Sequence, residues 1–227
     1  MSRLYVVPTP LGNLGDITLR ALEVLRGVHF ILAEDTRTSG HLLRHYGIEN
    51  ELVAYHQHNE HRITPQIVQR IREHGPAALV SDAGTPGISD AGYLLVQACV
   101  EAGVEVECLP GATALIPALI QSGFPAHAFV FAGFVPHHKG RRTFWEGLRH
   151  ETRTVICYES PHRIAKAAGE MEEALGPERK VCLVREISKK FMETWRGTAR
   201  EFVAHVQEKK PRGEMVLVIH GAEKKQS

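Results

Sequence analysis

The sequence has few cysteines and no long apolar run. Its four cysteines stand singly within apolar stretches, without the close pairing of a zinc site (Cys99, Cys108, Cys157 and Cys182). We therefore expect reduced cysteines buried in the core. No stretch reaches the roughly 18 apolar residues of a membrane span, and the first residues resemble a strand more than a secretion signal. These absences predict a cytoplasmic protein.

A surplus of charge of either sign is also missing. Lysine and arginine number 27 against 26 aspartates and glutamates, so the formal net charge is +1. A chain with this balance has to bind nucleic acid through a local basic patch, because the whole molecule does not attract a polyanion. What the chain does contain is the composition of a globular protein, with 43% hydrophobic residues in a length of 227. That length provides one or two domains with real cores.

Short apolar runs alternate with amphipathic helical patterns, which is typical of an α/β protein with mostly parallel strands. The pattern weakens near residue 120, so we predict an N-terminal α/β domain over 1–120, a C-terminal α/β domain over 121–221 and a polar tail over 222–227. Strands are predicted at 4–7, 28–32, 78–80 and 104–109 in the first domain, and at 129–134, 154–158, 181–187 and 215–219 in the second.

Two helices have clear start and stop signals. One is predicted to begin at an Asp90 cap and to end at Gly103. The other is predicted to begin at Ser160, with Pro161 in its first turn, and to end at Gly176. Its apolar stripe recurs at helical spacing (Ile164, Ala167, Ala168, Met171 and Leu175).

Four strands lead into loops rich in glycine, proline and small polar residues. Ligands of open α/β sheets bind outside the carboxyl ends of the strands, so we expect these loops to converge on a binding site. The loops are PTPLGNLGDIT (8–18), SDAGTPGISDAG (81–92), LPGATAL (109–115) and YESPHR (158–163). The first has neither dinucleotide-binding nor P-loop spacing. Taken alone, this loop is explained equally well as a binding loop or as a plain strand-to-helix turn, with Asp16 or Thr18 as the cap of the next helix.

In this order and spacing, the four loops, with AEDTR (33–37) and GF (133–134), resemble the tetrapyrrole methylase superfamily from residue 4 to about 221. The match is best to the branch that methylates the ribose 2′-hydroxyl of a cytidine in small-subunit ribosomal RNA. The resemblance implies two α/β domains with S-adenosylmethionine in the cleft between them, a homodimer, and ribosomal RNA or the 30S subunit as substrate. It implies cofactor contacts at Pro10, Leu11, Gly12, Asp82, Gly84, Thr85, Thr113, Ala114, Tyr158, Met215 and Leu217.

Methyl transfer from a sulfonium to a ribose hydroxyl is an in-line displacement in which a proton has to leave, and it requires no metal. We favour Asp35 as a base or hydroxyl-orienting group, with Arg37 as its partner or as a phosphate contact. The alternative is an Asp–Arg pair that caps the following helix. In YHQHNEHR (55–62) we select His58 as a catalytic group and Asn59 as an RNA contact. The alternative for both is a solvated polar role, and the HxHxxH spacing does not predict a metal.

The segment PHHKGRRTFW (136–145) is the best nucleic-acid feature of the sequence. Lys139, Arg141 and Arg142 are predicted to bind RNA phosphates, while Phe144 or Trp145 stacks on an unpaired base. The alternative is a solvated helix start with both aromatic rings in the core.

Two rival functions are a methyltransferase acting on a tetrapyrrole or another small molecule, and a non-enzymatic RNA-binding module. The basic segment disfavours the first, and the glycine-rich loops disfavour the second.

Overall fold

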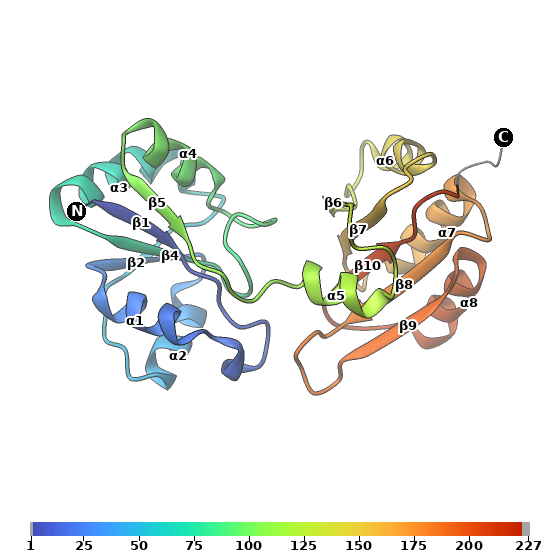
Figure 1. Ribbon diagram of the computed structural model, residues 1–227, viewed down its shortest axis with the longest axis horizontal. Helices are drawn as coiled ribbons and strands as arrows, with labels where there is room; N and C mark the ends of the chain where they lie inside the picture. The colour runs from blue at the N-terminus through green and yellow to red at the C-terminus, as the bar shows by residue number, and fades with distance from the viewer. Residues whose placement is uncertain (1, 224–227) are drawn as a thin grey trace. The chain divides into compact units, whose positions relative to one another are not determined.

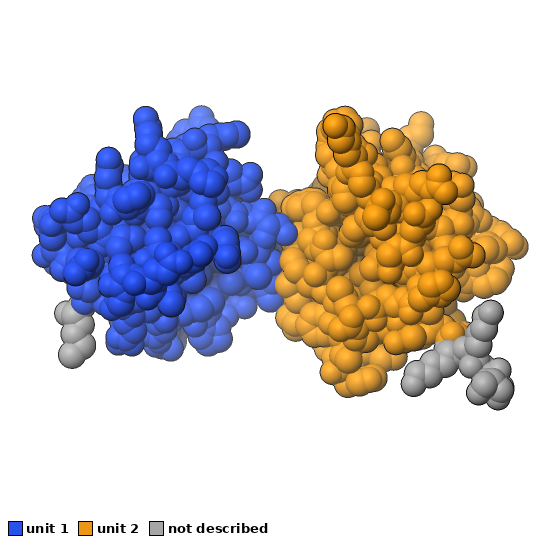
Figure 2. Space-filling view, turned by 90° about the horizontal axis from the view of Figure 1, so that it is seen from above, with its two compact units in different colours: residues 1–113 blue, residues 114–227 orange. Residues whose placement is uncertain are grey.

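The computed structural model describes residues 2–223 (Figure 1). The chain divides into two compact units, unit 1 over residues 1–113 and unit 2 over residues 114–227 (Figure 2). The division falls a few residues before the boundary that the sequence pattern suggested near residue 120.

Unit 1 alternates strands and helices along the chain. Its elements are β1 (Arg3–Val6), the 3₁₀ helix η1 (Leu14–Asp16), α1 (Leu19–Gly27), β2 (Phe30–Ala33), α2 (Thr36–His45), β3 (Leu52–Ala54), α3 (Glu60–His74), β4 (Ala77–Val80), α4 (Tyr93–Glu101) and β5 (Glu105–Cys108). The strands form one sheet in the order β3-β2-β4-β1-β5, and every pairing is parallel. The parallel α/β arrangement predicted for this half is confirmed. The sequence pattern missed β3, which is three residues long and has no buried residue.

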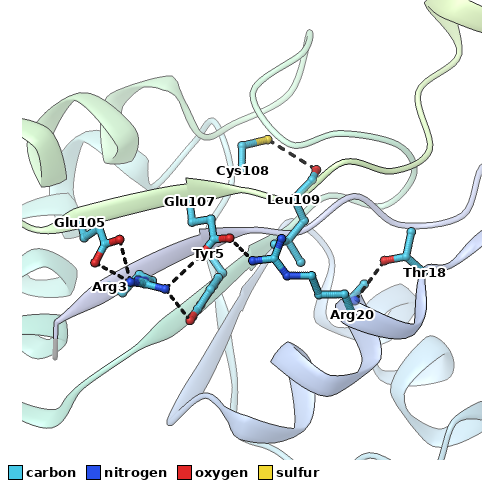
Figure 3. Close-up of polar contacts among 9 residues, drawn as sticks. Arg3, Tyr5, Thr18, Arg20, Glu105, Glu107, Cys108 and Leu109 are labelled. Carbon is cyan, nitrogen blue, oxygen red and sulfur yellow. Dashed lines mark hydrogen bonds and ion pairs between the residues drawn. The ribbon is translucent and has the colours of Figure 1, made fainter.

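Helices cover both faces of this sheet. Helices α3 and α4 share one apolar cluster with the sheet, and α1 and α2 share a second cluster on the other face (Figure 1). The central strands β2 and β4 are buried at every residue, as expected for strands covered on both sides. The edge strand β5 is instead charged: Arg3 of β1 bonds Glu105 and Glu107, and Arg20 of α1 pairs with Glu107 (Figure 3). Charged side chains of this kind protect a sheet edge from pairing with other chains.

Helix ends test the predicted capping signals. Thr18 caps α1 by accepting a hydrogen bond from Ala21 N at 3.0 Å, as one of the two alternatives predicted. The predicted Asp90 cap is wrong, because α4 begins two residues later, after Gly92. Gly92 has φ 144°, and a Cβ there would lie 3.0 Å from the Leu79 side chain. Any other residue would be strained at this position, so the glycine determines where α4 begins. The predicted stop at Gly103 is confirmed by its φ of 69° directly after the helix.

Unit 2 has a mixed sheet. Its elements are α5 (Leu115–Ser122), β6 (Phe129–Phe134), α6 (Arg141–Leu148), β7 (Thr154–Glu159), α7 (Ile164–Leu175), β8 (Lys180–Arg185), β9 (Glu193–Thr198), α8 (Ala199–Lys209) and β10 (Met215–Ile219). The strand order is β6-β7-β10-β8-β9, and only β6 and β7 are parallel. The expectation of mostly parallel strands is therefore wrong for this unit. A loop without a helix joins β8 to β9, and β10 runs antiparallel to both of its neighbours.

The core of unit 2 lies between the sheet and helices α6, α7 and α8. All five residues of the predicted apolar stripe of α7 are buried in it, which confirms that stripe. The predicted start at Ser160 is wrong by several residues: the amides of Arg163 and Ile164 both bond the Ser160 carbonyl, so a separate turn precedes the helix.

Cysteine burial is mostly as expected. Cys99, Cys157 and Cys182 are buried, but Cys108 is exposed because it ends the edge strand β5. Across residues 2–223 there is no group of three or more potential metal ligands. Within the same range no helix is long and apolar enough to cross a membrane.

Candidate active site

Three loops meet at the carboxyl edge of the unit 1 sheet. Thr9, in the loop after β1, and Gly84, in the loop after β4, exchange two main-chain hydrogen bonds of 2.8 and 2.9 Å. The Thr85 hydroxyl donates to the Ala112 carbonyl in the loop after β5, at 3.0 Å. Gly111 passes so close to Pro8 that an added Cβ would lie 2.7 Å from the proline ring. The predicted convergence is thus real for the three loops of this unit.

A pocket of about 250 Å³ opens beside these loops. We call it the unit 1 pocket; it is lined by Thr9, Pro10, Gly12, Leu14, Thr38, Ser39, His41, Leu42, Ser81 and Asp82. The lining comes from the loops after β1 and β4, from η1 and from α2. Three of the positions that the resemblance marks for the cofactor are among these residues, namely Pro10, Gly12 and Asp82. The pocket therefore joins the candidate cofactor positions to the first turns of α2.

Asp35 is held as the cap of α2. Its Oδ1 accepts a hydrogen bond from the Arg37 amide at 2.8 Å, and its Oδ2 accepts one from the Arg37 guanidinium at 2.8 Å. The hydrogen bonds from Arg37 lower the pKa of the Asp35 carboxyl to about 2. A carboxylate that weakly basic is a poor proton acceptor at neutral pH. This geometry matches the alternative stated for Asp35, a capping Asp–Arg pair, and a role for Asp35 as a base or hydroxyl-orienting group stays a prediction.

Two further carboxylates, those of Glu34 and Asp82, lie at the same sheet edge. Glu34 directly follows β2, and Asp82 follows β4 and accepts a hydrogen bond from the Asp35 amide at 3.1 Å. Burial raises the pKa of Glu34, and the Asp82 carboxylate raises it further. Partial burial of the Asp82 carboxyl likewise raises its pKa. Glu34 is therefore a better proton acceptor than Asp35, although it was not selected from the sequence.

The histidine segment is divided between exposed and structural residues. His58 is exposed, and its ring lies edge-on to that of His56, with the centroids 5.9 Å apart. Asn59 holds the turn before α3: its Oδ1 accepts from the His56 amide and its Nδ2 donates to the Ala54 carbonyl, both at 2.9 Å. These bonds give Asn59 a structural role, and its assignment as an RNA contact stays a prediction. A catalytic role for His58 stays a prediction.

Arg141 is a core residue and not part of an RNA-binding surface. Its side chain is 5% exposed and forms ion pairs with Glu170 at 2.6 Å and Glu159 at 3.7 Å. It also donates a 2.7 Å hydrogen bond to the Pro136 carbonyl. The guanidinium is thus buried between the carboxylates of Glu170 and Glu159 inside unit 2, and its predicted contact with phosphate is wrong.

The other residues of the basic segment differ in exposure. Lys139 is exposed, and the Arg142 side chain is 91% exposed, with Glu146 at 2.7 Å. Trp145 is buried in the core, and Phe144 packs partly buried against the same cluster. The stated alternative, aromatic rings in the core, therefore holds for Trp145. Lys139 and Arg142 keep the exposure that a phosphate contact requires.

The candidate cofactor positions of unit 2 lie on β7, on β10 and before α5. Tyr158 is half-buried, with the rings of Phe131 and Phe134 edge-on at 5.1 and 5.4 Å. Met215 and Leu217 point into the core against the helices, because alternate residues of β10 face that side. A cofactor contact at these two positions would have to be made by the main chain, and it stays a prediction. Thr113 and Ala114 directly precede α5, and with Leu11 they stay predicted contacts.

Comparison with known proteins identifies the class. The family model of the tetrapyrrole (corrin/porphyrin) methylases matches residues 3–203, so the chain belongs to that family. The predicted family and the predicted enzyme class, a methyltransferase, are confirmed. A structure of uroporphyrin-III C-methyltransferase from Thermus thermophilus, complexed with S-adenosyl homocysteine, matches with a TM-score of 0.63 over 96% of this chain and 97% of that one, at 22% identity. The two-domain α/β fold predicted for this family is confirmed.

Two curated relatives are much more similar in sequence. Both are named ribosomal RNA small subunit methyltransferase I. The protein from Synechocystis sp. is 47% identical over 98% of this chain and 80% of its own length. The protein from Thermotoga maritima is 42% identical over 98% of this chain and the whole of its own length.

Three residues of the candidate site were not selected as site residues from the sequence. Glu34 stands next to the selected Asp35, and its position directly after a fully apolar strand was the available signal. Ser39 is four residues into α2, where a small polar residue in a helix gives no signal of its own. Thr9 lies within a recognised loop, but only the structure shows that its hydroxyl turns inward to the Ser81 carbonyl at 3.0 Å.

Proposed function

We propose that this chain methylates the ribose 2′-hydroxyl of a cytidine in small-subunit ribosomal RNA. It is an S-adenosylmethionine-dependent methyltransferase, in keeping with its family. The RNA substrate is inferred from one observation, the 47% identity, over 98% of the chain, to a protein named as a ribosomal RNA small subunit methyltransferase. This substrate places the enzyme in the cytoplasm, where small ribosomal subunits are found.

The loops of unit 1 supply the groups that this reaction needs. Gly12 and Asp82, which lie at the exposed edge of the unit 1 pocket, contact the cofactor together with the neighbouring Pro10. Gly84 and Thr85 hold the neighbouring loop in shape through the Thr9 and Ala112 bonds. The cofactor supplies the methyl group on a sulfonium. The protein orients the ribose hydroxyl and removes its proton, and a positioned base typically contributes about 10²- to 10⁴-fold to the rate.

Glu34 is the residue we assign to proton removal. It lies at the carboxyl end of β2, beside the Asp82 carboxylate that lines the pocket. Burial and the Asp82 charge raise the pKa of Glu34, so its carboxylate holds a proton more strongly than that of Asp35. Asp35 then caps the start of α2 next to this carboxylate, with the exposed Arg37 guanidinium paired to it.

Lys139 and Arg142 are the exposed cations that we assign to RNA phosphates. They lie just before and at the start of α6, and the buried Arg141 between them fixes this segment to unit 2. Two exposed cations suit a chain with little net charge, since the attraction to RNA then comes from a local patch.

A tetrapyrrole or another small molecule is the second candidate substrate, and the family description favours it. The structural relative that acts on uroporphyrin-III is 22% identical to this chain, whereas the RNA-named relatives reach 42 to 47%. The closer similarity supports RNA.

One experiment tests the substrate. The protein is incubated with labelled S-adenosylmethionine and either small ribosomal subunits, their free RNA or uroporphyrinogen III. We expect label in ribosomal RNA at a single nucleotide, and the bond after that nucleotide should resist alkaline hydrolysis because a methylated 2′-oxygen cannot attack the phosphate. Label in uroporphyrinogen and none in RNA would contradict the proposal.

We also infer a homodimer. Helix α4 exposes Tyr93 and Val100 to 68% and 63%, and their spacing of seven residues places them on one face. An exposed apolar face of this kind supports association with another chain. Sedimentation equilibrium should show twice the chain mass, and replacing both residues with glutamate should give monomers. A wild-type protein that sediments as a monomer would contradict this inference.

A further inference from the structure

The unit 1 pocket has a buried inner wall and an exposed rim. Thr9, Ser39 and Ser81 are 2 to 4% exposed and form its inner wall. Gly12, His41 and Asp82 are exposed and form its rim. A ligand that enters from solvent therefore meets hydroxyl groups inside and a carboxylate at the entrance.

Ser39 leaves this inner wall with an unused hydrogen-bonding group. Within residues 2–223 its buried Oγ has no hydrogen-bond partner, whereas the Thr9 hydroxyl donates to the Ser81 carbonyl. Leaving a buried hydroxyl unpaired costs stability. A serine side chain has a single torsion with three staggered positions, so the hydroxyl can turn toward a ligand. The unpaired Oγ thus indicates a ligand atom that the folded chain itself does not provide.

The size and the walls of the pocket narrow the choice of ligand. Leu14 and Leu42 give the pocket apolar lining, and His41, whose ring is flat, lies at the rim. Its volume of about 250 Å³ is below the roughly 300–1,000 Å³ of pockets that enclose a whole drug-sized ligand. It therefore fits one part of a larger molecule. The inner wall carries no charged side chain, so the charged amino-acid end of S-adenosylmethionine is a poor match.

We propose that the unit 1 pocket receives the unstacked base of the RNA nucleotide that is methylated, with Ser39 Oγ hydrogen-bonding the polar edge of that base. The inference rests on the proposed RNA substrate. Proteins that recognise RNA by sequence commonly bind unstacked bases, which they stack on flat side chains such as histidine and hydrogen-bond at their polar edges. With the base inside, its ribose lies at the rim, next to Asp82 and the residues assigned to the cofactor.

Two pocket variants and one control test this assignment. Ser39→Ala removes only the unpaired hydroxyl, and Leu42→Trp fills the pocket. The control is Ser122→Ala in α5, because the buried Ser122 hydroxyl is fully used: it donates to the Leu119 carbonyl at 2.6 Å and accepts from the Phe124 amide at 3.0 Å. For each protein we would measure thermal stability, S-adenosylmethionine affinity by calorimetry, and kcat/KM for methylation of the RNA.

Ser39→Ala should melt at or above the parent temperature and keep its cofactor affinity, while kcat/KM for RNA falls about 3- to 10-fold through loss of one hydrogen bond. Leu42→Trp should lower kcat/KM for RNA at least tenfold with unchanged cofactor affinity. Ser122→Ala should melt lower than the parent and keep the parental kcat/KM.

Two results would overturn the inference while the proposed function stands. One is parental kcat/KM for RNA in both pocket variants. The other is a cofactor affinity in Leu42→Trp that falls as far as methylation does, which would assign the pocket to the cofactor. A parent protein that transfers no methyl group to RNA contradicts the proposed function itself, and the inference falls with it.

Discussion

Replacing Arg141 with methionine tests whether this residue stabilises the fold or binds RNA. Its guanidinium is 5% exposed, and its Nε donates to Glu170 Oε2 at 2.8 Å. Removing one partner of a buried ion pair costs about 3–5 kcal/mol. The lower end applies here, because Glu170 keeps a 3.2 Å hydrogen bond from Trp145, and Glu159 keeps Arg163 at 2.9 Å. A loss of about 3 kcal/mol lowers the melting temperature of a domain of this size by about 10 °C.

The stability lost in Arg141→Met should also depend on pH, and this dependence is a second test of the same variant. Burial raises the pKa of Glu170, but hydrogen bonds from Arg141 and Trp145 outweigh it and leave the pKa lowered. A carboxylate with a lowered pKa stabilises the fold above its ordinary pKa of about 4.3, and this contribution is lost as pH falls through the lower folded value. The stability difference between the parent and Arg141→Met should therefore be widest near neutral pH and should narrow below about pH 4.

Thermal melts from pH 3 to pH 8 and RNA-binding titrations at several salt concentrations would measure both effects. Arg142→Met is the matched control: its side chain is 91% exposed, and exposed ion pairs contribute little, so its melting temperature should stay close to that of the parent. An Arg141→Met protein that melts like the parent and binds RNA with a smaller salt dependence would refute the reasoning. It would return Arg141 to the RNA-binding surface.

Three further predictions concern the site. Asp82→Ala should weaken S-adenosylmethionine binding by about 10- to 150-fold, the effect of losing a charged hydrogen bond; unchanged affinity in calorimetry of the folded variant would exclude that contact. Replacing Lys139 and Arg142 together with alanine should reduce the salt slope of RNA binding by about 2 and keep cofactor affinity; an unaltered slope would show that both are only solvated. Glu34→Gln should slow single-turnover methylation about 10²-fold or more. Because the pKa of Glu34 is raised, the parental rate should increase with pH above the usual carboxyl range, and this rise should disappear in the variant; a variant within a few-fold of the parent would exclude Glu34 as the base.

The sequence by itself determined the class of fold and the position of the binding loops. Strands β2 and β4 are continuous apolar runs, and the loop after β4 contains the glycines that a close main-chain approach requires. Local patterns of this kind depend on burial and backbone freedom, which are encoded residue by residue. For the same reason the apolar stripe of α7 could be predicted, although its first turn could not.

Tertiary structure alone decided which polar residues are free to act. Arg141 and Arg142 are neighbours in the sequence with the same chemistry, yet one is buried among carboxylates and the other is exposed. Asp35 and Glu34 are likewise adjacent, but the cap of α2 engages one, and burial beside Asp82 raises the pKa of the other. Exposure and pKa depend on residues distant in the chain, such as Glu170 and Asp82, and a linear pattern does not report which distant groups the fold brings together.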